Sequence, residues 1–299
     1  MENLDQKKDY KQGLLSALGC AFWWGIMPIY WQWLKPVDSM VIIFYRIFLV
    51  ALVCFIAAKV KYSFKEIFEP LKDKKILIKY IIAGILITVN WSIYIWAVNA
   101  DHVIQTCIGY YIEPLVVCAF GMIFFKEKLS KFRIIAICFA LVGVISVVIY
   151  FHEVPIIALS IALSFSCYAA MKKDLHMPPV LSLFYETIFL APFALAIIFY
   201  IEFTGQGALV SSTGLVYFLL MFCGLFTALP LVLFANATNK VSLVVLGLTE
   251  YISPTISLII SIFYFKEPFE PIQLIAFIII WIGLVFFTIG EYKDYKANI

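Results

Sequence analysis

Four ionisable side chains interrupt long apolar stretches of this sequence: Arg46, Glu113, Glu186 and Glu250. A charge at the centre of a bilayer costs roughly 2.5–3.5 kcal/mol on insertion scales, so such groups face a cavity or each other. The functional interpretation is a substrate site or a proton site, and the alternative is structural pairing, for example of Arg46 with Glu186. We predict all four as coupling or charge-pair residues, and Glu113 and Glu250 as substrate-binding residues as well.

Aromatic and amide side chains accompany the two carboxylates. Tyr110 lies one helical turn before Glu113, and Tyr251 follows Glu250 directly. Aromatic rings bind an aromatic or cationic molecule by stacking or by cation–π contact. Besides the two glutamates, the predicted substrate-binding residues are Trp24, Asn90, Trp91, Tyr94, Tyr110, Tyr168 and Tyr251.

Three prolines lie within the apolar stretches, at Pro28, Pro114 and Pro254. Proline lacks a backbone N–H and frees a carbonyl one turn earlier, which kinks a helix. We predict that these kinks serve as hinges. A kink that only adjusts packing explains them equally well.

The sequence contains none of the motifs that would indicate metal or nucleotide chemistry. Its seven cysteines lie in apolar runs without metal-ligand spacing, and it has neither a P-loop nor an HExxH motif. We therefore expect no metal site, no cofactor and no enzymatic activity. A net charge of +3 is too small to indicate nucleic-acid binding.

The composition of the 299-residue chain excludes an ordinary soluble domain. Apolar residues make up 64% and charged residues only 14%, whereas soluble domains average roughly 45–50% and about 25%. One membrane span takes about 20 apolar residues. The fold class predicted here is all-α integral membrane with ten transmembrane helices, at 13–33, 38–58, 76–97, 103–125, 130–150, 155–171, 180–201, 213–236, 241–265 and 271–290.

The distribution of basic residues predicts the orientation. When alternate links are assigned to opposite sides of the membrane, 19 of the 22 Lys and Arg residues fall on one side. Lys35 and Lys266 fall on the other side, and Arg46 lies within a span. Basic residues accumulate in cytoplasmic links. Both termini are therefore predicted to be cytoplasmic.

The sequence matches itself at an offset of 140 residues. The stretch 111–114, Tyr-Ile-Glu-Pro, lies on 251–254, Tyr-Ile-Ser-Pro, and 125–127, Phe-Lys-Glu, recurs at 265–267. Five spans separate equivalent positions, so the second copy inserts in the opposite orientation, an arrangement typical of secondary transporters. We predict two inverted five-helix repeats at 13–150 and 155–290, between cytoplasmic tails at 1–12 and 291–299.

Five motifs of the chain form a recognisable pattern: Trp24-Gly-Ile-Met-Pro-Ile-Tyr-Trp31, Asn90-Trp-Ser-Ile-Tyr-Ile-Trp-Ala-Val-Asn99, Gly109-Tyr-Tyr-Ile-Glu-Pro114, Glu186-Thr187 and Leu246-Gly-Leu-Thr-Glu-Tyr-Ile-Ser-Pro-Thr255. With these motifs the sequence resembles the drug/metabolite transporter superfamily, and within it the bacterial EamA-type, RarD-like proteins. The resemblance covers essentially the whole chain. It departs from the pattern at three positions, with Glu113 where Asn is expected, Glu250 in place of Gln and Gln105 in place of Glu.

The resemblance implies a multi-pass transporter of the bacterial inner membrane. We expect a secondary active transporter that works by alternating access and exports a small amino-acid-like, amphipathic or aromatic metabolite. Proton coupling through Glu113 or Glu250 is the hypothesis, and the protein is expected as a monomer or a homodimer in the lipid bilayer. The alternatives are a passive facilitator or channel and, with less support, an intramembrane lipid-modifying enzyme.

Overall fold

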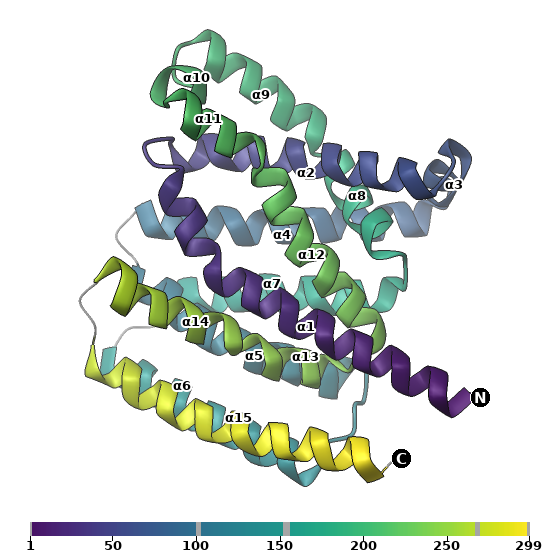
Figure 1. The fold of residues 1–299 in the computed structure, drawn as a ribbon, viewed down its shortest axis with the longest axis vertical. Coiled ribbons are helices and arrows are strands. Elements are labelled where there is room, and N and C mark those ends of the chain that lie inside the picture. The colour runs from purple at the N-terminus through teal and green to yellow at the C-terminus, as the bar shows by residue number, and fades with distance from the viewer. Residues whose placement is uncertain (1, 100–102, 152–155, 267–269, 298–299) are drawn as a thin grey trace. The chain divides into compact units, whose positions relative to one another are not determined.

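The computed structural model describes residues 2–99, 103–151, 156–266 and 270–297. Within these ranges all regular structure is helical (Figure 1). The elements are α1 (Glu2–Trp33), α2 (Ser39–Lys61), α3 (Phe64–Phe68), η1 (Glu69–Lys72), α4 (Lys74–Asn99), α5 (Val103–Phe124), α6 (Lys131–Phe151), α7 (Ile156–Leu175), α8 (Pro179–Ile188), α9 (Ala191–Phe203), α10 (Ala208–Ser211), α11 (Gly214–Met221), α12 (Cys223–Lys240), α13 (Leu243–Glu250), α14 (Ile252–Ile260), η2 (Ser261–Phe265) and α15 (Pro271–Ala297).

The helices have the length and composition of membrane spans. In the described part of the chain, eight helical segments are long and apolar enough to cross a membrane. The count rises to nine if α8 and α9, which meet at a bend of 55°, form one broken span. The apolar stretch Ile108–Phe124 of α5 falls below the length of these segments. The chain is thus an all-helical, multi-span membrane protein, and the number ten stays a prediction.

The chain divides into two compact units by packing, whereas the predicted repeats are a division by sequence and stay a prediction. Unit 1 contains Met1–Val89 and Met171–Lys240, and unit 2 contains Asn90–Ala170 and Val241–Ile299. Each unit therefore combines segments from both halves of the sequence. The physical reason is the choice of packing partners: in unit 1, α2 packs against α8, α9 and α12, and in unit 2, α6 packs against α15 and α5 against α13.

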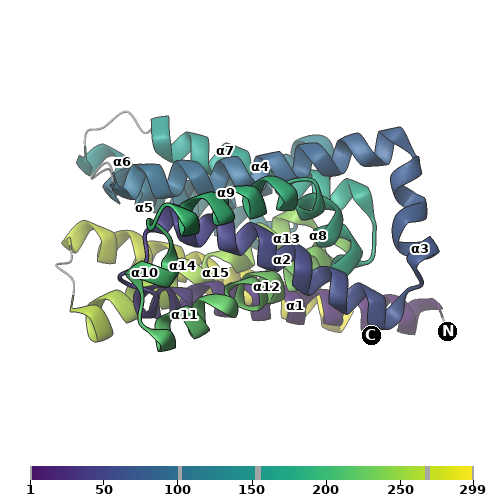
Figure 2. The same cartoon turned by 90° about the horizontal axis from the view of Figure 1, so that it is seen from above.

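Unit 1 is centred on α2 and α12. Helix α1 packs along α12, and Trp23 donates its indole N–H to the carbonyl oxygen of Phe226 at 2.9 Å. The rings of Tyr30 and Phe226 stack with centroids 4.5 Å apart. At the far end of α2, α3 turns the chain toward α4, as Figure 2 shows from above. Aromatic side chains thus supply much of the packing between α1 and α12.

Unit 2 contains the long antiparallel pair α6 and α15, which lie side by side in Figure 1. A β-carbon at Gly143 would lie 3.0 Å from the carbonyl oxygen of Ala276, and one at Gly283 would lie 3.0 Å from that of Ala136. Small residues such as glycine allow helix backbones to approach this closely. The two contacts are equivalent under the 140-residue offset, because 136 and 143 correspond to 276 and 283.

Some helix boundaries differ from those predicted. The sixth segment was expected to end at residue 171, with Lys172 in a link, but α7 continues to Leu175. Lys172 therefore lies in the last turn of a helix, and its side chain is buried. The seventh and ninth segments are each divided into shorter helices, α8 with α9 and α13 with α14. The backbone bends by 55° between α8 and α9, whereas α13, α14 and η2 remain one candidate span. Hydropathy reveals neither division, because it records composition and not backbone geometry.

Candidate functional site

Glu113 and Glu250 lie on two helices of unit 2 that approach closely. Helix α13 packs against α5, and a β-carbon at Gly247 would lie 2.7 Å from the carbonyl oxygen of Pro114. This approach brings the neighbouring Glu113 and Glu250 close enough for their charges to interact. The structure thus brings together two of the four ionisable residues that the sequence singles out.

The Glu250 carboxyl group is buried, and no hydrogen bond offsets the loss of contact with water among the described residues. Its residue is 5% exposed, and within the described residues neither carboxyl oxygen has a hydrogen-bond partner. Glu113 is 8% exposed. Two buried acidic groups whose charges interact are electrostatically unfavourable when both are charged, and a proton on one of them removes the repulsion.

The backbone around Glu250 is held in place by a chain of hydrogen bonds. Helix α13 ends at Glu250, and α14 begins at Ile252. The Tyr251 hydroxyl donates to the carbonyl oxygen of Tyr111 at 3.0 Å, so it ties the break to α5. Thr255 donates its hydroxyl to the carbonyl oxygen of Tyr251 at 2.8 Å, and Trp281 of α15 donates its indole N–H to the Thr255 hydroxyl oxygen at 2.9 Å.

Glu127 positions the start of α13, a role that the sequence analysis missed. Its two carboxylate oxygens accept from the backbone N–H groups of Leu243 at 2.7 Å and Val244 at 2.9 Å. A carboxylate at a helix N-terminus satisfies exposed donors and interacts favourably with the helix dipole. The signal was present in the repeated Phe-Lys-Glu motif, which ends on Glu127 in the first copy.

The other predicted substrate-binding residues of unit 2 are of two kinds. Tyr94 and Tyr110 form an edge-to-face pair with centroids 5.6 Å apart, and both are more than a third exposed. Asn90 is buried, and its amide N–H₂ donates to the Ile161 carbonyl and the Ser164 hydroxyl of α7 at 2.9 and 3.1 Å. The tyrosine pair can meet a ligand, whereas the Asn90 amide nitrogen holds two helices together.

Two further predicted residues are enclosed to different degrees. Tyr168 is fully buried on α7, and its ring centroid lies 5.9 Å from that of Phe165. Trp91 is half-buried on α4. Tyr168 therefore belongs to the packed interior of unit 2.

Glu186 forms a buried ion pair in unit 1. Its carboxylate accepts from the Lys172 ammonium group at 2.5 Å, and both side chains are completely buried. The Ser182 hydroxyl lies in the same cluster, 2.8 Å from the Lys172 nitrogen and 3.3 Å from the Glu186 oxygen. Pairing of a buried carboxylate was expected, but with Arg46; Lys172 was missed because it was assigned to a link.

Arg46 and Trp24 also lie in unit 1. The Arg46 guanidinium carbon is 5.2 Å from the centroid of the Trp31 ring, a cation–π contact. The ring centroids of Trp24 and Phe234 are 5.7 Å apart. Arg46 and Trp24 thus belong to unit 1, whereas Glu113 and Glu250 belong to unit 2.

The three prolines occupy different positions in their helices. Pro28 and Pro114 lie inside α1 and α5, and Pro254 lies in the first turn of α14, just after the break. Their role as hinges stays a prediction.

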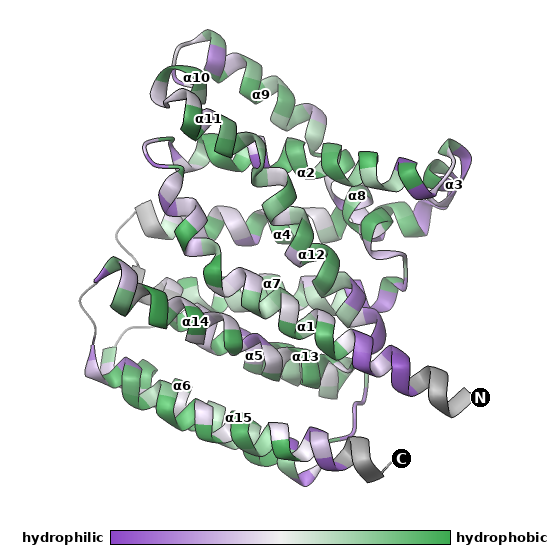
Figure 3. Ribbon diagram, in the orientation of Figure 1, coloured by the Kyte–Doolittle hydropathy of each residue, from purple (hydrophilic) through white to green (hydrophobic). Residues whose placement is uncertain are grey.

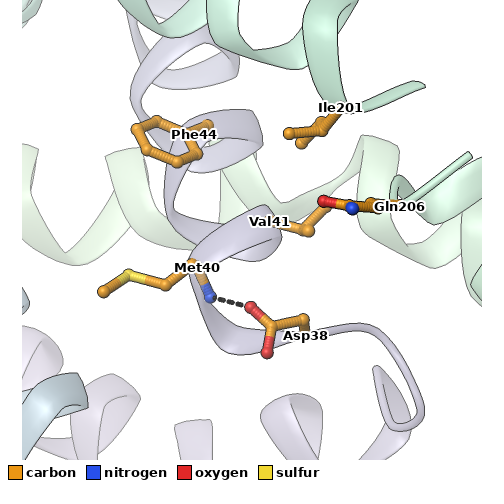
Figure 4. A pocket seen from close by; sticks show the side chains of 6 residues that line it. All are labelled: Asp38, Met40, Val41, Phe44, Ile201 and Gln206. Carbon is orange, nitrogen blue, oxygen red and sulfur yellow. Dashed lines mark hydrogen bonds between the residues drawn. The ribbon is translucent and has the colours of Figure 1, made fainter. Parts of the chain in front are cut away.

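A cavity of about 360 Å³ lies elsewhere, between the start of α2 and the end of α9 (Figure 4). Asp38 and Gln206 lie at its edge, and Asp38 accepts from the backbone N–H of Met40 at 2.8 Å. None of the predicted substrate-binding residues lines this cavity. Among the described residues, no group of three His, Cys, Asp or Glu side chains could hold a metal ion.

Comparison with known proteins identifies the family. The model of the EamA-like transporter family matches the chain twice, at residues 11–149 and 154–289. An uncharacterized transporter of Bacillus subtilis, YojE, is 35% identical and the match covers 98% of this chain and 99% of the relative. The RarD proteins of Streptomyces exfoliatus and Escherichia coli are 33% and 30% identical, over 94% of this chain and 90% and 95% of theirs.

A solved crystal structure with 15% sequence identity matches the fold with a TM-score of 0.71, over 92% of this chain and 96% of that one. The sequence motifs, the apolar helices and the full-length relatives agree with one another. The chain belongs to the EamA-like transporter family and is a RarD-like member of the drug/metabolite transporter superfamily.

Proposed function

We propose that this transporter is a proton-coupled secondary carrier that exports a small amphipathic or aromatic metabolite from the bacterial cytoplasm by alternating access. It acts as a carrier and not as an enzyme. The observation that carries the proposal is the Glu250 carboxyl group, buried next to Glu113 and, among the described residues, without a hydrogen-bond partner.

The chemistry of coupling follows from this pair. A carboxyl group that releases its proton where water reaches it, and regains one when it is enclosed, links proton movement to a change of conformation. Helix α13 ends at Glu250 and α14 begins at Ile252 within the same candidate span, so Glu250 lies at an interruption of the regular helix. Tyr94 and Tyr110, both partly exposed, are the proposed contacts for an aromatic or cationic substrate.

Two inverted repeats with ten spans are the proposed architecture. In an antiparallel pair of equivalent helices, each contact has a counterpart with the two halves exchanged. The Gly143–Ala276 and Gly283–Ala136 contacts have this relation. Lys126 and Lys266, equivalent under the 140-residue offset, share a positive φ of 51° and 55°, which is unusual for a residue with a side chain. The two matches of the family model support the same division.

A proteoliposome assay tests coupling directly. The purified protein is reconstituted with a pH-sensitive dye inside the vesicles, and radiolabelled phenylalanine, tryptophan and an aromatic amine are tried in turn as substrates. We expect uptake of at least one probe to depend on a pH gradient and to move protons in the opposite direction. Glu113→Gln and Glu250→Gln should each abolish the effect of the gradient, whereas Glu270→Gln, at an exposed carboxylate, should preserve it.

The outcomes separate the alternatives. If both glutamine variants keep full gradient-driven uptake, the coupling role is wrong. If flux only dissipates a substrate gradient and ignores pH, the protein is a passive facilitator. Product formed by the purified protein without any compartment would indicate an intramembrane enzyme instead.

The proposed orientation has both termini in the cytoplasm, which follows from the basic residues of alternate links. Fusions of alkaline phosphatase and of green fluorescent protein to the C-terminus report the two possible sides. Fluorescence without phosphatase activity is the expected result, and the reverse pattern would contradict the orientation.

A further inference from the structure

An apolar groove on unit 1 has a basic segment at one end. The groove has a volume of about 260 Å³, and all eight residues that line it are apolar. It follows α2 from Phe48 to Phe55, about 10 Å along the helix axis. Its opposite wall is formed by Phe184 and neighbouring residues of α8 and α9, and Phe68 of α3 closes one end.

The groove lies on the surface of its unit. Leu52 and Phe68, which both line it, are 40% and 41% exposed. In a helix that crosses a membrane, an exposed apolar side chain contacts lipid tails. A groove of this composition therefore accommodates an acyl chain without leaving any polar group of the protein unsatisfied.

The basic segment is connected to the groove by aromatic contacts. Lys59, in the last turn of α2, holds its ammonium nitrogen 3.6 Å from the centroid of the Phe64 ring. The Phe64 ring lies 6.2 Å from that of Phe55, and Phe55 lines the groove. On the other side of Phe68, Lys72 lies four residues further along the chain in η1. Positive charge thus flanks the closed end of the groove.

Residues 59–75 contain six lysines and three carboxylates. Each carboxylate contacts a residue two or three positions away in the chain. Glu66 accepts from the backbone N–H and hydroxyl of Ser63 at 2.8 and 2.7 Å, Asp73 accepts from a backbone N–H at 2.8 Å, and Glu69 pairs with Lys72. The segment therefore keeps a net positive charge, and its hydrophilic residues gather at α3 in Figure 3.

We propose that this groove binds an anionic phospholipid, with one acyl chain along α2 and its phosphate among Lys59, Lys65 and Lys72. An anionic phospholipid combines an apolar tail and a negatively charged headgroup in the same order along the membrane normal. Juxtamembrane lysines attract anionic headgroups, and the apolar wall below them holds the tail. The site is independent of substrate transport, so its test does not depend on the proposed function.

Native mass spectrometry measures the lipid retained by the full-length protein after equilibration with dioleoyl phosphatidylglycerol or dioleoyl phosphatidylcholine. We expect one phosphatidylglycerol to remain bound under conditions that strip phosphatidylcholine. Leu52→Trp fills the groove and should remove the retained lipid. The triple variant Lys59→Gln/Lys65→Gln/Lys72→Gln should weaken binding about a hundredfold, since each lysine near the headgroups contributes about fivefold.

The matched control is Lys126→Gln/Lys128→Gln/Lys131→Gln, which removes two lysines from the link between α5 and α6 and one from the start of α6. It should keep the affinity of the unaltered protein for phosphatidylglycerol. Ile188→Trp fills the groove from α8 and replaces Leu52→Trp if that variant does not fold. Equal retention of the two lipids, or the same loss in the two lysine triple variants, or full retention in a folded groove-filling variant, would overturn the proposal.

Discussion

Each unit of the protein buries acidic groups among apolar helices, but the two units treat them differently. In unit 1, Glu186 is paired with Lys172 at 2.5 Å and supported by Ser182. In unit 2, Glu250 lies near Glu113, and its oxygens have no hydrogen-bond partner among the described residues. Glu186 and Glu250 are 1% and 5% exposed.

The difference separates a buried charge that has a partner of opposite sign from a buried acid that lies beside another acid. A buried ion pair is neutral as a whole, so proton exchange at one partner would leave the other charge uncompensated. When a carboxylate lies beside another carboxylate, taking up a proton removes the repulsion between the two negative charges. The proposed coupling role of Glu250 therefore rests on the charge of its neighbour as well as on its burial.

The largest effect is expected from breaking the pair in unit 1. Lys172→Met leaves Glu186 buried without a cation and should reduce the free energy of unfolding by about 3–5 kcal/mol. Thermal unfolding in detergent, calibrated by a denaturant titration, measures this loss. Lys79→Met is the control, because Lys79 pairs with Asp174 at the surface and should contribute about 0–1 kcal/mol. Similar losses in both variants would remove the distinction between the two pairs.

The opposite sign is expected in unit 2. Glu250→Met replaces a buried group that lacks a hydrogen-bond partner with an apolar side chain of similar length. The free energy of unfolding should rise by about 1–3 kcal/mol, because an unsatisfied group no longer has to be buried. The same unfolding assay, run beside the proteoliposome assay, should show a more stable protein without proton coupling. A loss of stability as large as that of Lys172→Met would contradict the comparison.

A smaller effect is expected from the hydrogen bond that holds the backbone near Glu250. Tyr251→Phe removes the donor to the Tyr111 carbonyl and keeps the ring. The free energy of unfolding should fall by about 0.5–1.5 kcal/mol. Amide hydrogen exchange should become faster in α13 and α14 while exchange in α6 is unchanged. Uniformly faster exchange would show that the bond supports the whole unit and not this break.

The smallest effect concerns an exposed acid, Glu66. The backbone N–H and hydroxyl of Ser63 donate to its carboxylate and hold the pKa of Glu66 below the ordinary value of 4.5. The ionised form thus stabilises the start of α3 above about pH 4.5, and this contribution is lost as the pH falls through the lower pKa of the folded state. Hydrogen exchange in α3 should show this dependence, Glu66→Gln should abolish it and Glu69→Gln should retain it.

Much of this arrangement was predictable from the sequence, because apolar composition and charge placement report directly on a membrane environment. The all-helical, multi-span character and the family were predicted and are confirmed. The approach of α5 and α13 was not predicted in detail, although Glu113 and Glu250 were expected to contribute to one site. Gly247 makes that approach possible, but the sequence alone does not show which helix packs against a glycine in an apolar run.

Two parts of the candidate site lay beyond sequence reasoning. The burial of Lys172 depends on where α7 ends, and helix ends are poorly defined by hydropathy. The use of the Asn90 amide to join α4 and α7 depends on a partner 71 residues away. Both side chains are polar, but only the packing of the helices decides whether such a group binds a ligand or another part of the protein.

The hydrogen bond between Tyr251 and Tyr111 connects two residues that occupy equivalent positions in the sequence repeat. It runs in one direction, from the second copy to the first. The Tyr251 carbonyl accepts from Thr255, and the residue equivalent to Thr255 in the first copy is Leu115, which has no donor. In the proposed alternating-access cycle, exchange of the two halves would replace this bond by its mirror image and lose the threonine's support. The two end states of that proposed cycle would then differ in energy at this bond, before any gradient acts.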